Sequence, residues 1–262
     1  MTGIITMPEK PRILLTNDDG IDAPGLHALA ASLRPLGDLV VVAPAVERSA
    51  VGHAITLSDP LRVWDYPMSK DLTGYAVNGT PADCVKIGCW ALLKRKPDVV
   101  VSGINLGANT GINTIYSGTV SAATEGAILG IPSFAVSLCT YSNPDFSYAA
   151  GFARKMTRML LKKRLPQGVY LSINVPACRE EEIRGVSVTR QGLAMYREIF
   201  DKRVDPHGRT YYWLSGQKMN KEESIDVDDG AVQSNYVSVT PVHYDLTKYD
   251  FIDSLKKWEL KK

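Results

Sequence analysis

Short apolar runs of strand length alternate with amphipathic stretches of helix length through about the first two thirds of this 262-residue chain. This alternation constrains the fold more than any other feature. The opening segment predicts a strand over 12–16, a helix over 24–33 with a proline at its start, and a second strand over 39–43. The β-branched run Val40 to Val42 is typical of a strand buried on both faces of a parallel sheet. The sequence therefore predicts an α/β fold.

Later segments continue the pattern. Thr80, Pro81 and Asp83 form a helix-start signal, which predicts a helix reaching about residue 93. We further predict strands over 98–102, 134–138 and 169–175, strand-like pieces over 61–64 and 75–77, and helices over 119–129 and 146–165. After about Pro176 charged and aromatic residues mix, with strands expected over 186–189 and 237–239 and an amphipathic segment over 251–260. We expect residues 1–176 to form the main domain, and residues 177–262 to pack on it or exchange with a second subunit.

Composition is ordinary for a soluble globular protein, at 45% hydrophobic and 22% charged residues. A net charge of +2 is too small to indicate a nucleic-acid polymer as partner. One basic cluster fits the solvated face of a helix better than a polyanion site. Its members are Arg154, Lys155, Arg158, Lys162, Lys163 and Arg164.

Four cysteines, at 84, 89, 139 and 178, form no CxxC pair and lie in or beside apolar segments, a pattern typical of reduced, buried thiols. Neither a signal peptide nor an apolar run of about 18 residues is present, so we expect no membrane span. A cytoplasmic location is the default expectation.

Asn17, Asp18, Asp19 and Gly20 follow the first predicted strand directly. Ligands of open α/β sheets collect beyond the carboxyl ends of the strands, where these acids would lie. Hard cations prefer such oxygen ligands, and Gly20 would let the chain turn so that both carboxylates converge. The alternative is a plain solvated turn, because Asn, Asp and Gly are common turn residues.

Two further loops can reach the same edge of the sheet. The loop after the second strand carries Ser49, whose hydroxyl could bind a cation. It also carries Arg48 and His53, which could bind an anion or donate a proton. The alternatives are that Ser49 is only a turn residue and that His53 has a structural role. The later loop has glycines at 103, 107 and 111 with Asn105 and Asn109 between them. Its spacing matches neither a dinucleotide fingerprint nor a Walker A loop.

Ser117, Gly118 and Thr119 stand directly before or at the start of a predicted helix. Hydroxyls and free backbone N–H groups there would form a phosphate site, while ordinary helix capping is the alternative. A cation site beside a phosphate site is the layout of metal-assisted phosphoryl chemistry. Asp18 and Asp19 would supply negative charge and Ser49 and Asn105 neutral ligands.

These motifs closely resemble the SurE family, named for stationary-phase survival. The resemblance covers roughly residues 12–190. It rests on Thr16 to Ile21, Pro24-Gly25, the loop Pro44 to Thr56, Val77 to Val85, Ser102 to Asn105 and Tyr116 to Val120. It implies a Rossmann-like three-layer αβα catalytic domain and a C-terminal extension that takes part in dimer or tetramer formation.

The resemblance also implies a metal-dependent phosphatase acting on nucleoside 5′- and 3′-monophosphates, with short-chain polyphosphate as a further substrate of some members. One divalent ion per subunit, Mg²⁺ or Mn²⁺, would be held by Asp18, Asp19, Ser49 and Asn105. Phosphate would be bound by Asn109, Ser117, Gly118 and Thr119.

The nucleophile is either Asp18 or a water held by the ion. Two other classes of protein are alternatives to an enzyme. A receiver-like signalling module would need a phosphorylatable Asp after a later strand, where this chain has Ser102 and Asn105. A non-catalytic nucleotide-binding stress protein would keep the pocket without turnover, and the intact ligand set argues against it.

Overall fold

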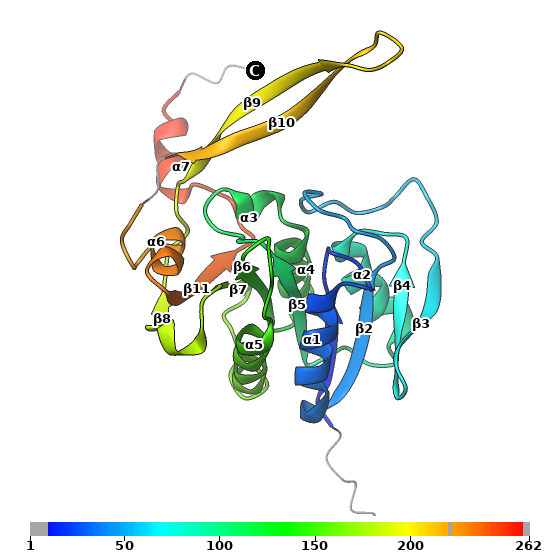
Figure 1. Ribbon diagram of the computed structural model, residues 1–262. Coiled ribbons are helices and arrows are strands. Elements are labelled where there is room, and N and C mark those ends of the chain that lie inside the picture. Colours follow the sequence, from blue (N-terminus) through cyan, green and yellow to red (C-terminus); the bar gives the residue numbers. More distant parts are fainter. Residues whose placement is uncertain (1–9, 220–221, 259–262) are drawn as a thin grey trace, which may run out of the picture.

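One mixed sheet organises the protein, whose computed structural model describes residues 10–219 and 222–258 (Figure 1). Within these residues nine strands pair in the order β3-β4-β2-β1-β5-β6-β7-β11-β8. The six central strands run parallel: β4 (Leu72–Val77), β2 (Asp38–Pro44), β1 (Arg12–Thr16), β5 (Val99–Leu106), β6 (Ser133–Cys139) and β7 (Val169–Pro176). The chain moves from β1 outward to β2 and β4 and returns to β5 on the other side of β1. This reversal makes the β1/β5 boundary the topological switch point.

Helices cover both faces of the sheet. On one face α1 (Pro24–Leu33) packs against α5 (Ser147–Leu160), and on the other α2 (Pro81–Ile87) packs against α4 (Gly118–Ile128). The short helix α3 (Asn113–Tyr116) leads into α4, and single turns lie at Arg34–Leu36, Gly88–Leu92 and Glu180–Glu182. The predicted three-layer α/β fold is confirmed.

The core lies between the sheet and these two helical layers. Ile13, Leu14 and Leu15 of β1 are fully buried, since a central parallel strand is covered on both faces. Burial of such side chains contributes roughly 1.5–3 kcal/mol each to folding. The core therefore fixes β1, and with it the residues that follow β1.

Several predicted boundaries differ from the structure. The helix expected to reach residue 93 ends at Ile87, where a π-helical turn, Gly88–Leu92, replaces it. The helix expected over 146–165 ends at Leu160. The strand expected over 98–102 continues to Leu106 through a register shift between Ser102 and Asn105. A side chain at Gly103 would place a Cβ 2.3 Å from the Val136 carbonyl oxygen, so the shift requires glycine.

Residues after 176 extend the same sheet. β11 (Tyr236–His243) pairs antiparallel with β7, β8 (Gly185–Val188) pairs with β11, and β3 (Val63–Ser69) closes the opposite edge beside β4. The strand-like piece expected over 61–64 thus begins only at Val63. The domain boundary near residue 176 stays a prediction, because the sheet continues across it.

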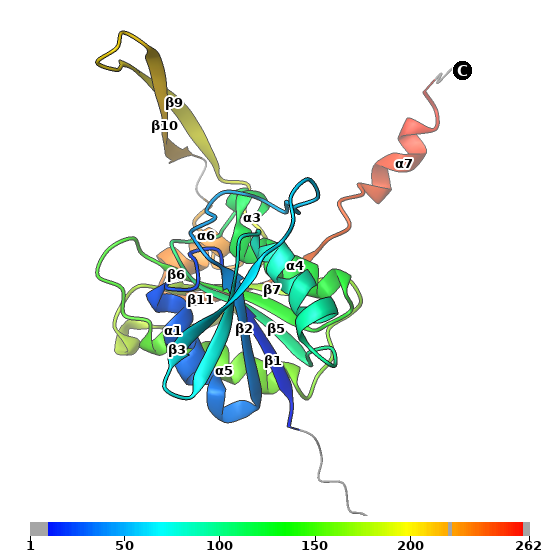
Figure 2. The same ribbon diagram turned by 90° about the vertical axis from the view of Figure 1, so that its right-hand side faces the viewer.

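A long hairpin, β9 (Met195–Val204) and β10 (Thr210–Met219), projects away from the body, and the two views place it clear of the sheet (Figures 1 and 2). Sequence analysis did not predict it. The short helix α6 (Asp228–Gln233) follows the hairpin, and α7 (Tyr249–Leu255) follows β11. The amphipathic segment expected over 251–260 partly lies outside the described residues, which end at 258.

Among the described residues, no helix has the length and apolar character needed to cross a bilayer. None of the four cysteines, which all lie among the described residues, forms a disulfide bond. Cys84 and Cys89 are buried, whereas Cys139 and Cys178 are only half-buried, because they lie at or beyond the ends of β6 and β7. The prediction of wholly buried thiols was therefore wrong for the last two.

Candidate metal and phosphate site

The turn after β1 places two carboxylates at the switch point. Asn17 Nδ2 donates to the Gly20 carbonyl oxygen at 2.9 Å, and Gly20 has φ of +100°, a conformation that favours glycine. Asn17 to Gly20 therefore form a turn, as the alternative interpretation of these residues predicted. That same turn presents Asp18 and Asp19 at the carboxyl edge of the sheet.

Asp18 is joined to two other predicted site residues. Its carboxylate, in a side chain only 4% exposed, accepts a hydrogen bond from the Thr119 hydroxyl. The same Thr119 oxygen lies 3.2 Å from Oδ1 of Asn105. Asn105 Nδ2 donates to the Gly107 carbonyl oxygen at 2.8 Å, which turns the oxygen of the carboxamide toward Thr119. The structure thus brings together the ends of β1 and β5 and the start of α4.

Neither of the two carboxylates is paired with a basic side chain among the described residues. Burial raises the pKa of Asp18, and hydrogen bonds from Thr119 and from backbone N–H groups only partly offset that rise. Burial and repulsion by Asp18 and Glu47 raise the pKa of Asp19 to about 7. Across residues 10–219 and 222–258, Asp18 and Asp19 form no ion pair with a basic side chain. Two neighbouring, desolvated acids that form no ion pair with a basic side chain among the described residues fit a cation.

The described residues contain no cluster of three or more His, Cys, Asp or Glu side chains suited to a metal. A cation at this edge would therefore need neutral oxygens beside the two acids. Asn105 Oδ1 lies 3.2 Å from the Thr119 hydroxyl oxygen, and this hydroxyl donates a hydrogen bond to Asp18. Carboxylate, carboxamide and hydroxyl oxygens, with water, are the ligands that Mg²⁺ and Mn²⁺ prefer.

Ser49 lies on a loop anchored to the acidic turn. The backbone N–H of Arg48 donates to the Asp18 carbonyl oxygen at 2.7 Å. The exposed Ser49 hydroxyl donates to Glu47 at 2.6 Å, and no hydrogen bond in the described part of the chain joins it to Asp18, Asp19 or Asn105. The proton of Ser49 thus points to Glu47, which leaves the oxygen lone pairs for another partner. Glu47, two residues before Ser49, was not among the predicted site residues, although its charge helps to raise the pKa of Asp19.

The start of α4 approaches Asp18 closely. The Ser117 hydroxyl caps the helix by accepting from the Val120 N–H at 3.1 Å, so the capping alternative is confirmed for Ser117. A Cβ at Gly118 would lie 2.7 Å from the Asp18 Cβ and 2.9 Å from its Oδ2. The positive end of the helix dipole therefore faces the acidic turn. Thr119 also has a role that sequence analysis did not foresee, since its hydroxyl is bonded to Asp18.

Asn109 lies in the loop after β5, anchored by neighbouring strands. Its backbone N–H donates to Oδ1 of Asn174 at 2.8 Å, and its Nδ2 donates to the Ser137 hydroxyl at 2.9 Å. Asn109 is 8% exposed. These bonds fix the position of Asn109, and each of its two nitrogens, backbone N and side-chain Nδ2, donates to another residue of the protein.

His53 contacts a buried carboxylate on α4. Its Nε2 lies 3.0 Å from Oε2 of Glu125, and Lys86 Nζ donates to Oε1 at 2.7 Å. Glu125 is 2% exposed, and its hydrogen bonds to His53 and Lys86 lower its pKa despite burial. His53 therefore joins its loop to α4, which supports the structural interpretation of this residue. Sequence analysis missed Glu125, because no signal in a helix of small residues marked it.

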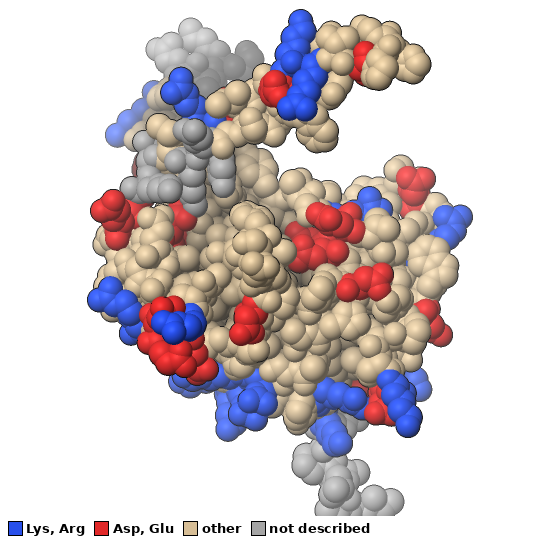
Figure 3. Space-filling view, in the orientation of Figure 1, with Lys and Arg blue, Asp and Glu red and all other residues tan. Residues whose placement is uncertain are grey.

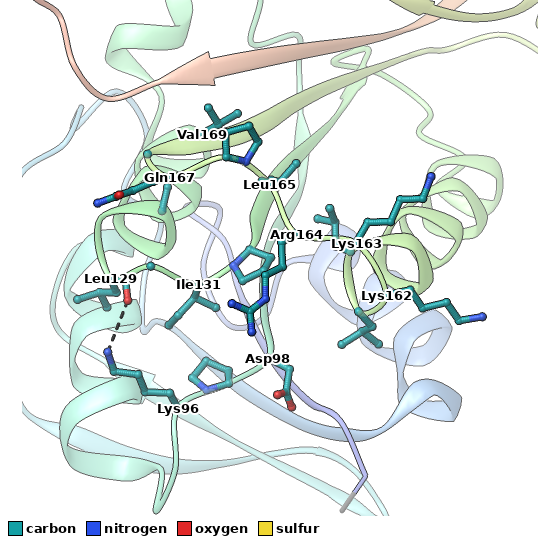
Figure 4. A pocket seen from close by; sticks show the side chains of 18 residues that line it. Lys96, Asp98, Leu129, Ile131, Lys162, Lys163, Arg164, Leu165, Gln167 and Val169 are labelled. Atoms are coloured by element: carbon teal, nitrogen blue, oxygen red, sulfur yellow. Dashed lines mark hydrogen bonds between the residues drawn. The ribbon is translucent and has the colours of Figure 1, made fainter.

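A cavity lies at the other end of the sheet. A cavity of about 600 Å³ opens between the starts of β5, β6 and β7 and the end of α5. Arg164 reaches into it and Lys96 lines its side, whereas Lys162 and Lys163 point away (Figure 4). On the face in view, basic side chains gather along the lower edge of the body and on the hairpin, and acidic side chains are spread over the body between them (Figure 3). The candidate site is thus separate from this cavity.

A mostly parallel sheet with helices on both faces, and polar loops converging at its switch point, defines a Rossmann-like α/β protein that binds ligands at the carboxyl edge. Comparison with known proteins identifies the particular family. A family model described as Survival protein SurE matches residues 13–198, and the chain belongs to the SurE family.

Individual relatives match almost the whole chain. It is 52% identical over 254 residues to the 5′-nucleotidase SurE of Chlorobium phaeobacteroides, covering 97% of this chain and 98% of that protein. It is 55% identical over 246 residues to the 5′-nucleotidase SurE of Syntrophus aciditrophicus, covering 94% and 92%. The crystal structure of SurE protein from Aquifex aeolicus matches with a TM-score of 0.81 at 44% identity, covering 94% of this chain and 98% of that one. The resemblance found in the sequence is confirmed.

Proposed function

We propose that this protein is a metal-dependent phosphatase that removes phosphate from nucleoside 5′- and 3′-monophosphates, with short-chain polyphosphate as a further substrate. The observation that carries the proposal is the pair of desolvated carboxylates, Asp18 and Asp19, beside the start of α4. Full-length relatives named 5′-nucleotidase SurE support the substrate class.

One divalent ion per subunit, Mg²⁺ or Mn²⁺, would be held by Asp18, Asp19, Ser49 and Asn105. When bound, such an ion neutralises phosphoryl charge and lowers the pKa of a coordinated water. The fit rests on the two uncompensated acids, on the Asn105 oxygen turned toward Thr119, and on the free lone pairs of Ser49.

The phosphate group would be bound by Asn109, Ser117, Gly118 and Thr119. Backbone N–H groups at the start of an eleven-residue helix favour an anion there. The Thr119 hydroxyl would orient Asp18, and the Asn109 carboxamide would contact a phosphate oxygen from the opposite loop. Asp18 belongs to the catalytic group, whether it acts on phosphorus or holds the ion.

We also propose that the protein acts in the cytoplasm as a homodimer or homotetramer. Residues 1–176 would form the catalytic domain and residues 177–262 the extension used in assembly. The support is the projecting hairpin, whose apolar side chains are exposed. They include Ile199, Phe200, Tyr212, Trp213 and Leu214.

The decisive experiment measures phosphate release from a panel of nucleoside 5′- and 3′-monophosphates and tripolyphosphate with Mg²⁺, Mn²⁺ or a chelator. We expect chelation to abolish release and the metal to restore it. An Asp19→Asn variant should lose several kcal/mol of transition-state stabilisation, on the order of 100-fold or more in kcat/KM. The matched control is Asp22→Asn, which makes the same change at an exposed position of the same turn.

Three outcomes would contradict parts of this proposal. Release that is unaffected by chelator, or an Asp19→Asn variant with the wild-type rate, would refute the metal site. Nucleotide binding without any release, under all metals, would favour the non-catalytic stress protein instead.

A further inference from the structure

A buried carboxylate far along the chain from the candidate site holds one of its loops. Asp228, the first residue of α6, is 2% exposed. It accepts backbone hydrogen bonds from Gly111 at 2.8 Å, from Gly192 at 2.9 Å and from Asp229 at 2.8 Å. Burial raises the pKa of Asp228, while these three N–H groups lower it.

The donors come from two distant segments. Gly111 follows the candidate phosphate residue Asn109 by two positions, whereas Gly192 lies three residues before Met195, the first residue of β9. Asp228 itself lies beyond β10. The Asp228 carboxylate therefore joins the segment that leads into β9 to the loop that carries Asn109.

Two neighbouring contacts reinforce this junction. The Thr110 hydroxyl donates to Asp229 Oδ1 at 2.6 Å, and Gln191 Nε2 donates to the Gly111 carbonyl oxygen at 2.9 Å. Each residue from 109 to 111 is thus bonded to a part of the fold outside its own loop, since Asn109 is held by Asn174 and Ser137. The loop is fixed from the sheet on one side and from the C-terminal segment on the other.

Packing at the junction leaves little room for movement. Gly111 has φ of +59°, and a Cβ there would lie 3.2 Å from the Ala194 carbonyl oxygen. A Cβ at Gly192 would lie 2.9 Å from Oδ1 of Asp228. Because a buried N–H that loses its acceptor is costly, removal of the carboxylate would release the loop at Gly111 and not at Asn174.

We propose that Asp228 is a positioning residue for the phosphatase reaction. Its carboxylate holds the 109–111 loop in the position in which Asn109 binds the substrate phosphate. None of the hydrogen bonds of Asp228 described above joins it to a proposed metal ligand or to the start of α4. Its effect is therefore on phosphate affinity and not on the ion. This role rests on the proposed function, and in particular on Asn109 as a phosphate ligand.

The test compares Asp228→Asn with the matched control Asp226→Asn, two residues earlier and exposed on the same segment. The carboxamide keeps a single acceptor oxygen and directs an NH₂ group at a backbone donor. For Asp228→Asn we expect KM for the nucleotide, and the inhibition constant of inorganic phosphate, to rise about tenfold, the effect of weakening one charge-assisted hydrogen bond. Turnover at saturation should change about twofold at most, and Mn²⁺ affinity by calorimetry should match the control.

Hydrogen exchange of the full-length protein supplies a readout that does not depend on activity. Backbone amides at 110–112 should exchange faster in Asp228→Asn than in Asp226→Asn, while amides of β1 and β5 should not. If Asp228→Asn fails to fold, Gly192→Ala displaces the carboxylate without removing it and should raise KM in the same direction.

Unchanged KM and phosphate inhibition in the folded Asp228→Asn variant, or in Gly192→Ala where the first does not fold, would refute the role of Asp228. Equal losses of Mn²⁺ affinity and turnover would refute it too, because they indicate general damage. A wild-type protein without phosphatase activity would refute the proposed function itself, and the role of Asp228 with it. The exchange result would still report whether Asp228 holds the loop.

Discussion

At the scale of single residues, the contacts of Asp18 bear on how phosphorus is attacked. Thr119 donates to one carboxylate oxygen, and the backbone of Gly118 lies against the other. A carboxylate held on both sides is poorly placed to form a bond to phosphorus. We therefore expect water to be the nucleophile, with Asp18 holding the ion or accepting a proton.

Stereochemistry at phosphorus distinguishes the two routes. A single in-line attack by water inverts the configuration, whereas a phosphoryl–Asp18 intermediate requires two displacements and retains it. With a nucleoside phosphorothioate labelled with two oxygen isotopes and hydrolysed in water of the third, we expect inversion in the released thiophosphate. Retention would establish Asp18 as the nucleophile and contradict this reading of its contacts.

Glu125 offers a prediction about stability. Its folded-state pKa is lowered below the ordinary value of 4.5 by hydrogen bonds from His53 and Lys86. The resulting stabilisation is fully present above the unfolded pKa and is lost as pH falls through the folded pKa. Glu125→Gln should lower the free energy of unfolding by about 1–3 kcal/mol at pH 7, and by less near pH 3.

Urea unfolding at the two pH values measures this difference. The control is Glu182→Gln, which removes the carboxylate of a solvent-exposed ion pair with Arg179 and should leave the free energy of unfolding nearly unchanged. An equal effect of Glu125→Gln at both pH values would show that its charge contributes nothing.

The residues of the site divide into those that sequence could predict and those that it could not. Asp18, Asp19 and Asn105 were predictable, because they directly follow or end strands whose carboxyl ends share one edge. The bond between Asp18 and Thr119 joins positions 101 residues apart. Such a contact depends on where α4 begins in space, and no local pattern encodes it.

At the scale of elements, the start of α4 matters most. Gly118 lets the helix approach Asp18, since any added Cβ would lie 2.7 Å from the Asp18 Cβ. We expect Gly118→Ala to displace Asp18, to weaken Mn²⁺ binding at least about tenfold and to lower phosphatase activity in parallel. Calorimetric metal titration and phosphate release measure the two effects.

Gly151→Ala on α5 is the matched control, because no atom lies within 4 Å of an added Cβ there. It should leave metal binding unchanged and stabilise the helix by roughly 0.5–1 kcal/mol. If Gly118→Ala binds Mn²⁺ as tightly as this control, the close approach of α4 does not serve the metal site.

Elements with a regular hydrophobic pattern were predictable, and the hairpin shows why others were not. A half-buried strand alternates apolar and polar residues, and a central parallel strand is continuously apolar. The side chains at 197–204 of β9 and at 210–216 of β10 are exposed on both faces of the hairpin, and apolar neighbours such as Ile199 and Phe200 follow one another directly. Their β-structure comes from pairing with each other, which leaves no periodic signal.

At the scale of the whole molecule, the hairpin presents more apolar surface than an isolated subunit needs. Phe200 and Leu214 pair across the two strands and are 61% and 59% exposed. Large contiguous apolar surface usually marks an interface. The double variant Phe200→Glu/Leu214→Glu should therefore sediment as a smaller species than the wild-type protein in analytical ultracentrifugation.

Leu57→Glu is the control, since it introduces the same charge at an apolar residue that is 86% exposed on the body. It should keep the wild-type oligomeric state. Identical sedimentation of the double variant and the wild-type protein would contradict assembly through the hairpin.

The continuation of the sheet beyond residue 176 has a consequence for how the chain avoids aggregation. β11 pairs with β7 over six residues, from Ser238 with Asn174 to His243 with Val169. Without β11, an almost wholly buried apolar strand would become an open sheet edge, with unpaired N–H and C=O groups available to another chain. The last third of the chain thus covers the β7 edge, and a shortened protein ending at residue 176 should associate edge to edge.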